Sequence, residues 1–270
     1  MKTQNQLSDN TIETICLQHF YESLTCFSAL VDVDVTSSKS ATQVISPNIP
    51  NWLTNAVFNL NLESSKVTQA IEDITQRYRS NDVVPFWRLC PNDHPTNIHD
   101  HLIAAGYAQK MKQFLMSLNL DTVTQSPTLL DNIVIEQITT ASELRDKHLS
   151  FTRIKDSTHK SFATLMCDLF DYYGYEQDSV WRHYVAIQNG VSVGYGSAFY
   201  AEHVVGLYNV GVIPEAPRKG IATSLTLKAL RDAQQQGHKI ATLQSSEMAQ
   251  SMYEKIGFTT HFPIQYFAPA

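Results

Sequence analysis

The sequence lacks the features that mark several classes of protein, beginning with paired cysteines. Its four cysteines, Cys16, Cys26, Cys90 and Cys167, are scattered along the chain and form no CxxC pair. This spacing argues against a zinc site and against a disulfide framework, so we expect reduced thiols that are mostly buried. The ten histidines show no HxxxH or comparable spacing, and we therefore expect no bound metal.

Long hydrophobic runs and an excess of basic residues are also missing. The first residues, MKTQNQLSDN, lack the apolar core of a signal peptide, and nowhere do 18 apolar residues follow one another. We therefore expect a cytoplasmic protein that makes no contact with a membrane. The net charge of −6 argues against nucleic-acid binding, which needs a basic surface, whereas mild acidity suits a cationic partner such as an amine.

The composition that remains is that of a globular protein with a sizeable core. Hydrophobic residues make up 43% of the 270 residues and charged residues 17%, while aromatic residues contribute 10%. This length permits either one large domain or two of about 135 residues each.

Two parts of the chain repeat the same order of predicted elements, namely strand, helix, strand and a helix that ends at a glycine. The first set lies at 55–62, 66–80, 83–90 and 99–105, before Gly106. The second set lies at 204–213, 219–236, 239–243 and 250–256, before Gly257. Glycine readily adopts the left-handed conformation that follows many helices, and an aromatic residue then begins a strand in both parts. The repetition predicts two related domains in tandem.

A polar segment without clear periodicity separates the two predicted domains. This segment, Asp121–Asp131, contains Pro127 and is predicted to be a linker between a domain at 1–120 and a domain at 132–270. In the second domain we expect a strand at 133–138, helices over 141–175 with a break near Asp156, and a hairpin. The hairpin is predicted by Asn189-Gly190 between two β-rich runs.

One segment carries a chemical signal. A β-branched strand ends at Pro214, a short turn carries Arg218 and Lys219, and Gly220 opens a helix. The first N–H groups of a helix lack internal partners and the helix dipole is positive there, so such a turn can hold phosphate. On its own, however, a glycine beside two basic residues equally describes a solvated loop. The apolar stripe expected to face the sheet consists of Ile221, Leu225, Ala229 and Ala233.

The segments at 210–223 and 246–258 resemble the GNAT acetyltransferase superfamily. Its signature is a strand, a Gln/Arg-x-x-Gly-x-Gly/Ala turn and a long helix, and then a helix that ends in Tyr-x-x-x-Gly-Phe. Gly220 to Ala222 match the turn, and Tyr253 to Phe258 match the second element. Pro217 stands where the pattern has Gln or Arg, which removes one side-chain contact with the coenzyme.

The resemblance implies an α/β fold of two tandem GNAT-like domains, each a mixed, mainly antiparallel sheet flanked by helices. It also implies acetyl-CoA as co-substrate. The corresponding turn of the first domain, Glu63 to Lys66, has no glycine and carries an acid. We therefore expect the first domain to be a degenerate copy that does not bind the coenzyme.

By position, the resemblance places the coenzyme against three groups of residues. The pantetheine arm is expected along the backbone of Val210, Gly211 and Val212. The pyrophosphate is expected against Arg218, Lys219, Gly220, Ile221, Ala222 and Thr223. A further hydrogen bond is expected from Ser246, with Ser245 as the neighbouring candidate.

The resemblance also implies direct attack of an amine on the thioester, with Tyr253 as the acid that protonates the leaving thiolate. A phenol has a pKa of ~10 against ~8.5 for a thiol, so a hydrogen bond to the developing thiolate is easier than full proton transfer. Packing beneath the helix end is the structural alternative for this ring. The oxyanion donor is expected to be a backbone N–H near Asn209 or Val210. The base stays open among Glu202, His203, Tyr208 and Glu215.

Two functions are therefore open. The first is an N-acetyltransferase that acts on an amine-bearing small molecule or a protein amino group, and the second is a non-catalytic acyl-CoA-binding, sensing or protein-interaction module. Acceptor specificity is expected in the segment at 141–175, whose aromatic and acidic residues suit a cation but also an ordinary packed helix. Trp87 and Trp181 lie in apolar strands and are expected in the core. The sequence does not indicate an oligomeric state.

Overall fold

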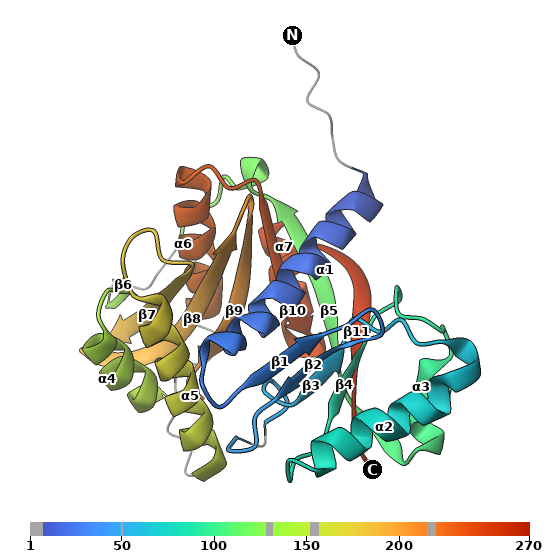
Figure 1. Ribbon diagram of the computed structural model, residues 1–270. Coiled ribbons are helices and arrows are strands. Elements are labelled where there is room, and N and C mark those ends of the chain that lie inside the picture. Colours follow the sequence, from blue (N-terminus) through green and yellow to red (C-terminus); the bar gives the residue numbers. More distant parts are fainter. Residues whose placement is uncertain (1–7, 50, 128–131, 152–156, 215, 217–219) are drawn as a thin grey trace. The chain divides into compact units, whose positions relative to one another are not determined.

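The computed structural model describes residues 8–49, 51–127, 132–151, 157–214, 216 and 220–270, with the backbone alone at 148–151 and 157–163 (Figure 1). These residues form two compact units. Unit 1 contains Met1–Glu22, Phe114–Ile138 and Asp178–His261, and unit 2 contains Ser23–Gln113, Thr139–Gln177 and Phe262–Ala270. Helix α1 (Asp9–Thr25) and strands β5 (Tyr107–Asn119) and β11 (Thr259–Pro269) each contribute residues to both units.

Unit 1 is built on a mixed sheet in which the strand order is β5-β10-β9-β8-β7-β6. Its antiparallel part consists of β6, β7, β8 and β9, and β10 then joins β9 in parallel after the crossover helix α6. The bounds are β6 Ile133–Ile138, β7 Trp181–Gln188, β8 Val191–Ala201, β9 Val204–Val212, α6 Ile221–Gln235, β10 Ile240–Ser246 and α7 Glu247–Ile256, with a short 3-10 turn, η3, at Leu120–Thr122.

Unit 2 has a mixed sheet with the order β1-β2-β3-β4-β11. Strands β3 and β4 are parallel and are joined by α2, whereas the neighbouring pairs are antiparallel. The strands are β1 Asp34–Ser37, β2 Thr42–Ile45, β3 Ala56–Phe58 and β4 Phe86–Leu89. The helices are α2 Val67–Arg79, α3 Ile98–Ala104, α4 Ala141–Phe151 and α5 Ser157–Tyr173, with 3-10 turns η1 at Cys26–Ala29 and η2 at Ser64–Lys66.

Two local predictions for unit 1 are confirmed, namely the hairpin at Asn189-Gly190 and the buried stripe of α6. Asn189 and Gly190 have φ of 50° and 77° and join β7 to β8, as a two-residue hairpin with both central residues left-handed requires. The stripe of α6 is buried against the sheet, with Ile221, Leu225, Ala229 and Ala233 each at most 3% exposed. Gly194 of β8 permits this approach, because a Cβ there would lie 2.7 Å from the Ile221 side chain.

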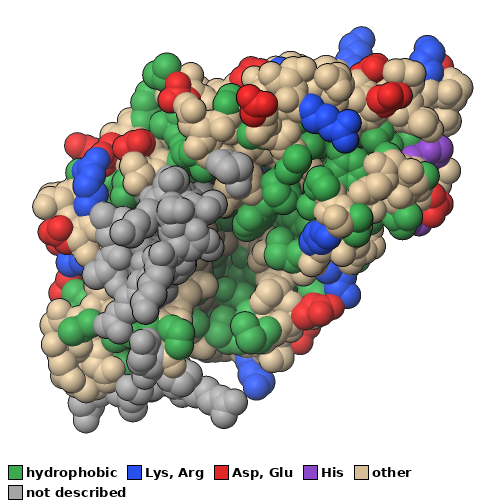
Figure 2. All heavy atoms as spheres, turned by 90° about the horizontal axis from the view of Figure 1, so that it is seen from below, with side chains coloured by type: hydrophobic (Ala, Val, Ile, Leu, Met, Phe, Trp, Pro, Cys, Tyr) green, Lys and Arg blue, Asp and Glu red, His purple; other side chains and the backbone are tan. Residues whose placement is uncertain are grey.

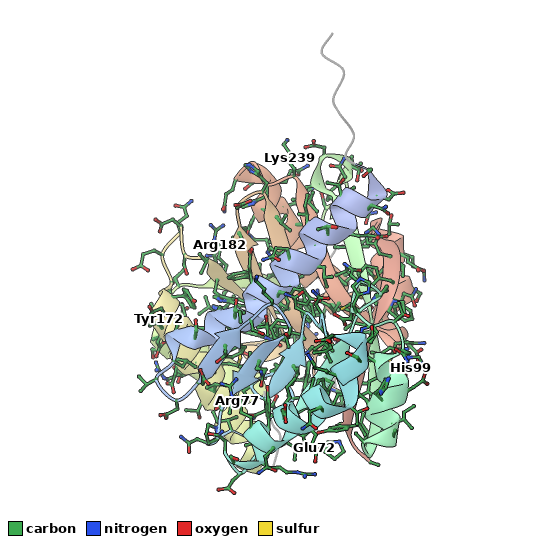
Figure 3. The ribbon with its side chains drawn as sticks, turned by 45° about the vertical axis from the view of Figure 1, so that its right-hand side comes forward. Glu72, Arg77, His99, Tyr172, Arg182 and Lys239 are labelled. Atoms are coloured by element: carbon green, nitrogen blue, oxygen red, sulfur yellow. The ribbon has the colours of Figure 1, made fainter. Side chains whose placement is uncertain are left out.

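Unit 2 has its own core, in which α2 packs on the sheet through Ile71 and Tyr78. The buried Tyr78 hydroxyl donates to the Ala56 and Val44 carbonyls at 2.7 and 3.0 Å, and so links α2 to two strands. On the exposed side, Arg77, labelled in Figure 3, donates to the Asp34 carboxylate at 2.6 Å. Trp87 is fully buried and Trp181 of unit 1 is 3% exposed, so their predicted core positions are confirmed.

Two predicted strands of unit 2 are longer than the observed ones. The strand predicted at 55–62 is β3, Ala56–Phe58, because Asn59 adopts a left-handed φ of 54° and ends it. The strand predicted at 83–90 is β4, Phe86–Leu89, which begins directly after Pro85, a residue with no N–H to donate to a ladder. Alternating apolar residues thus identified these strands but not their ends.

The repeated order of elements is present in the structure. The first series is β3, α2, β4, α3, Gly106 and β5, and the second is β9, α6, β10, α7, Gly257 and β11. Both first pairs of strands are parallel, and both glycines are left-handed, with φ of 87° and 117°. The compact units do not follow the predicted boundary at 121–131, because the residues after each glycine are shared between them. A tandem origin of the two series stays a prediction.

One face of the molecule carries charged side chains of both signs. On the face shown in Figure 2, Lys and Arg side chains are scattered among acidic ones. None of the helices formed by the described residues combines the length and hydropathy needed to cross a bilayer. All four cysteines are buried and free, as predicted.

Candidate active site

The candidate site begins where strands β9 and β10 of unit 1 part. Their parallel ladder runs from the pair Val204–Ile240 to the pair Leu207–Leu243. Strand β9 nevertheless continues to Val212, and β10 continues to Ser246. Both strands are described throughout, and no further pair joins them. The backbone of β9 beyond Leu207 therefore faces a fork into which an extended ligand could hydrogen-bond.

A bulge in β9 lies at this fork. The register with β8 shifts between Tyr195 and Ser197, so that Ser197 pairs with Tyr208 but Tyr195 pairs with Gly211. Asn209 has a left-handed φ of 55°. A bulge leaves one residue out of the ladder and re-aims the local backbone. The bulge occupies the position at which the sequence placed the oxyanion donor, near Asn209 and Val210.

Gly220 forms the mouth of α6. It is the N-cap residue, is exposed, and adopts the left-handed conformation with φ of 69°. The first backbone bond of the helix runs from the Ser224 N–H to the Gly220 carbonyl at 2.9 Å. The N–H groups of the three residues between them belong to the first turn, where an α-helix has no internal acceptors. Pro217, Arg218 and Lys219 lie outside the described residues.

The other predicted coenzyme contacts lie at the end of β9, in the first turn of α6 and at the end of β10. Val210, Gly211 and Val212 are half-buried at the end of β9. Ile221 is 1% exposed and packs on the sheet, so only its backbone could meet a ligand, whereas Ala222 and Thr223 are half-buried. Ser246 is the exposed N-cap of α7, and the buried Ser245 hydroxyl donates to the Ser246 carbonyl at 2.9 Å.

Tyr253 lies on α7, four residues before Gly257. It is 7% exposed, and its ring packs edge-on against Phe258 at 5.7 Å, so the packing role is confirmed. Burial raises the pKa of the Tyr253 hydroxyl to about 12, and the neighbouring Thr226 hydroxyl offsets only part of this effect. The phenol is therefore protonated at any physiological pH and can act there as a hydrogen-bond donor.

The structure separates the candidate bases. Glu202 and His203 form the turn that precedes β9, at the end of the strand opposite the fork. This position makes them poor partners for a reaction at Asn209, since several strand residues of about 3.3 Å each intervene. Glu215 lies outside the described residues. Tyr208 is half-buried and adjoins the bulge, but its hydroxyl lies back over Gly206, where β9 and β10 are still paired.

His19 of α1 is the partner of Tyr208, a contact that the sequence did not reveal. It is 3% exposed, and its ring stacks against Tyr208 with the centroids 6.4 Å apart. The Tyr208 hydroxyl lies 3.3 Å from His19 Nδ1. A lone histidine in a helix 189 residues before its partner carries no local pattern, so no motif could have found it.

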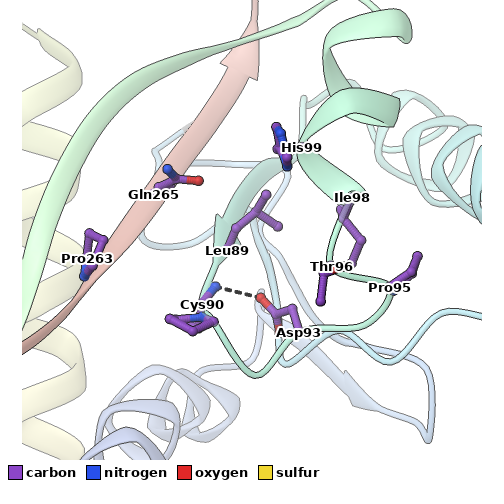
Figure 4. A pocket seen from close by; sticks show the side chains of 10 residues that line it. Leu89, Cys90, Asp93, Pro95, Thr96, Ile98, His99, Pro263 and Gln265 are labelled. Atoms are coloured by element: carbon purple, nitrogen blue, oxygen red, sulfur yellow. Dashed lines mark hydrogen bonds between the residues drawn. The ribbon is translucent and has the colours of Figure 1, made fainter.

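Unit 2 has a pocket at the corresponding end of its own parallel strands, of about 190 Å³ (Figure 4). It lies after β4 and beside the start of α3, and its lining includes Asp93, His99 and Gln265. The Asp93 carboxylate accepts from the backbone N–H groups of Leu60 and Cys90 at 2.8 and 2.7 Å. Burial raises the pKa of Asp93 to about 6, which leaves it mostly ionised at pH 7.

The turn before α2 in unit 2 is also acidic. Glu63 precedes the turn and binds Lys66 at 2.7 Å, and no glycine opens the helix. The carboxylates of Asp93 and Glu63 would repel a diphosphate ligand electrostatically. Among the residues that the structure places, no three or more His, Cys, Asp or Glu side chains gather as ligands of one metal ion.

Comparison with known proteins identifies one sequence match. Residues 142–258 match the family described as "Acetyltransferase (GNAT) family". No curated protein sequence matches the chain.

Solved structures resemble almost the whole chain. A GCN5-related N-acetyltransferase from Kribbella flavida has a TM-score of 0.67 and 13% identity, over 93% of this chain and 95% of its own. A GCN5-related N-acetyltransferase from Sphaerobacter thermophilus has a TM-score of 0.64 and 13% identity, over 92% and 84%. A tandem GNAT protein from the clavulanic acid biosynthesis pathway has a TM-score of 0.61 and 14% identity, over 85% and 78%. At these identities the likeness shows the fold, so the predicted α/β class with a mixed sheet is confirmed.

Proposed function

We propose that the protein transfers the acetyl group of acetyl-CoA to an amine, because residues 142–258 match the GNAT acetyltransferase family. The observation that carries this proposal is the fork beyond Leu207 and Leu243, with its bulge at Asn209. On the β10 side, the fork offers β9 backbone without a strand partner for a pantetheine arm, and the first turns of α6 and α7 follow these two strands. The coenzyme would lie along Val210 to Val212, with its diphosphate at Gly220 and a contact at Ser246.

The proposed reaction brings together an amine, the thioester carbon of acetyl-CoA and a backbone N–H donor. The amine nitrogen attacks this carbon and forms the C–N bond, the oxyanion is stabilised by a backbone N–H at the bulge, and the C–S bond then breaks. One amine proton leaves to solvent or a base, and the thiolate of coenzyme A takes up a proton. No covalent enzyme intermediate is required. The proposal thus depends on positioning and on electrostatic stabilisation.

Tyr253 is proposed as the donor to the departing sulfur. With a pKa of about 12 against ~8.5 for a thiol, complete proton transfer from its hydroxyl is uphill by roughly 5 kcal/mol. A hydrogen bond that strengthens as the sulfur gains charge avoids this cost. The structure therefore favours donation by Tyr253 over deprotonation of Tyr253.

Turnover on a panel of amines tests the proposed function. Release of free coenzyme A thiol from acetyl-CoA should depend on the added amine and should yield its N-acetyl product by mass spectrometry. Binding of acetyl-CoA without turnover on small amines, polyamines, amino acids and peptides would contradict the enzymatic proposal. That result would instead support the non-catalytic acyl-CoA-binding module, including a sensing or protein-interaction role.

We expect Tyr253→Phe to lower kcat by about 100-fold, with little change in the Kd of acetyl-CoA, because the hydroxyl acts only as charge develops on sulfur. Single-turnover kinetics with a saturating amine measure this effect. The matched control is Tyr184→Phe, which removes a buried hydroxyl of unit 1 that lies 3.4 Å from the Tyr200 hydroxyl. The control should keep kcat within about twofold of the parent. Equal losses in both variants would contradict a specific role for Tyr253.

A further inference from the structure

The pocket of unit 2 is lined by a buried carboxylate, that of Asp93. Asp93 is 6% exposed, and Figure 4 shows its carboxylate turned toward Cys90 within the ring of lining side chains. None of the described residues that line this pocket is Lys or Arg, and the only side-chain charge that acts on the Asp93 pKa is that of His94. Buried charges are normally paired with a counter-ion. The described part of unit 2 provides Asp93 with no Lys or Arg for this role.

Two backbone N–H groups stabilise the Asp93 carboxylate only in part. Oδ1 accepts from the Leu60 N–H at 2.8 Å, and Oδ2 accepts from the Cys90 N–H at 2.7 Å. Burial nevertheless raises the pKa of Asp93 to about 6, because its effect exceeds that of these two bonds and of His94. A carboxylate has about four positions that can accept a hydrogen bond, so about two of them stay available. A positive group in the pocket would offset the remaining cost of burial.

Two further side chains of the pocket have oxygen atoms to offer. Thr96 is exposed and Gln265 is half-buried, and neither side chain makes a hydrogen bond with a described residue. No polar atom at the end of either side chain is sealed from solvent. Together with Asp93 they place three acceptors around one small space. An ammonium group has three N–H donors and no acceptor, so it matches this set.

The rest of the lining is largely apolar and suits a short aliphatic chain. Leu89 and Ile98 are 8% and 2% exposed, and three prolines, Pro91, Pro95 and Pro263, lie around them. The volume of about 190 Å³ exceeds the ~150 Å³ of an engineered cavity that holds benzene. Since no three metal-ligating side chains gather among the residues that the structure describes, an organic cation fits the pocket better than a metal ion.

We propose that the pocket of unit 2 binds a primary ammonium ion on a short aliphatic chain, with Asp93 as its counter-ion and with Thr96 and Gln265 as further acceptors. The ammonium nitrogen lies at the Asp93 carboxylate, and the alkyl chain lies against Leu89 and Ile98. All residues that line this site belong to unit 2. The inference therefore goes beyond the proposed function and holds whether or not unit 1 transfers an acetyl group.

Titration of the intact protein with butylammonium at about pH 7.5 tests the site, with 1-butanol as an uncharged ligand of similar shape. At this pH both Asp93 and the amine carry their charges. The NMR amide signals of Leu60 and Cys90, whose N–H groups donate to Asp93, should shift and saturate. The Kd of butylammonium should be at least about tenfold lower than that of 1-butanol, because hydrogen bonds to charged groups are the stronger ones.

Two variants separate the polar contributions. Thr96→Val keeps the shape of an exposed side chain but removes its hydroxyl, and it should raise the Kd of butylammonium by about fivefold. Asp93→Asn should raise this Kd by at least about tenfold. The matched control is Asp73→Asn, which removes one negative charge from an exposed position of α2 outside the lining of the pocket. Its Kd should stay within about twofold of the parent.

Equal affinity for butylammonium and 1-butanol, or no saturable shift at the Leu60 and Cys90 amides, would overturn the inference. So would tighter binding of butyrate, or an unchanged Kd in Thr96→Val. If Asp93→Asn does not fold, as its amide spectrum would show, the comparison of ligands and Thr96→Val still decide. The titration measures no turnover, so a parent that acetylates amines but shows none of these effects would lose only this site.

Discussion

Gly220→Asp is expected to weaken acetyl-CoA binding by at least about 100-fold, which corresponds to roughly 2.7 kcal/mol. The substitution places a carboxylate at the mouth of α6, where the proposed diphosphate would lie, and the left-handed φ of 69° disfavours a side chain there. Repulsion between the carboxylate and the diphosphate adds to the loss of close backbone approach. Isothermal titration calorimetry of the variant with acetyl-CoA measures this effect.

The control for this prediction is Gly237→Asp. Gly237 is also left-handed, with φ of 88°, and a Cβ there would meet nothing within 4 Å. The control therefore introduces the same charge and a similar backbone cost just after α6, at the end of this helix opposite to Gly220. Its Kd should stay within about twofold of the parent. If Gly220→Asp bound acetyl-CoA as tightly as Gly237→Asp, the proposed diphosphate position at the start of α6 would be wrong.

The folded protein is expected to lose several kcal/mol of stability between pH 9 and 12. Burial raises the pKa of Cys16 from 9.0 to about 11 and that of Tyr253 from 10.0 to about 12. Burial likewise raises the pKa values of Tyr78, Tyr184 and Tyr266. Each pKa unit by which burial raises the pKa of a group costs about 1.4 kcal/mol of stability, once the group can ionise in the unfolded chain but not in the folded chain.

The sign of this effect follows from proton binding. Below pH 9 both states hold these protons, so the stabilisation is fully present. Above pH 9 to 10 the unfolded chain releases them while the folded chain retains them, and stability falls until the pH passes the folded pKa values. Urea unfolding at pH 8, 9.5 and 10.5 measures the decline. Tyrosinate absorbance should rise together with unfolding, and a gradual rise near pH 10 with all tyrosines accessible in the folded state would contradict the prediction.

The sequence predicted the local features of the site because each has a short-range physical cause. Gly220 and Gly257 mark the ends of helices, and both adopt the left-handed conformation that glycine tolerates. The stripe of α6 follows from helical periodicity, and the hairpin follows from Asn189-Gly190.

Local sequence patterns did not predict the long-range features of the site. A strand pattern around Tyr208 does not show that β10 leaves β9 at Leu207, nor that Glu202 and His203 lie at the far end. His19 meets Tyr208 only because Gly206 leaves room and α1 packs on that face. The sharing of β5 and β11 between the two compact units likewise depends on sheet order, which no local pattern encodes.

The central claim is that the fork of unit 1 and the mouth of α6 hold an acyl-CoA. Calorimetric titration of the intact protein with acetyl-CoA tests it most directly. The account predicts saturable binding of one molecule per chain, because acidic groups occupy the corresponding places in unit 2. No detectable uptake of acetyl-CoA, or of any longer acyl-CoA, would contradict the account.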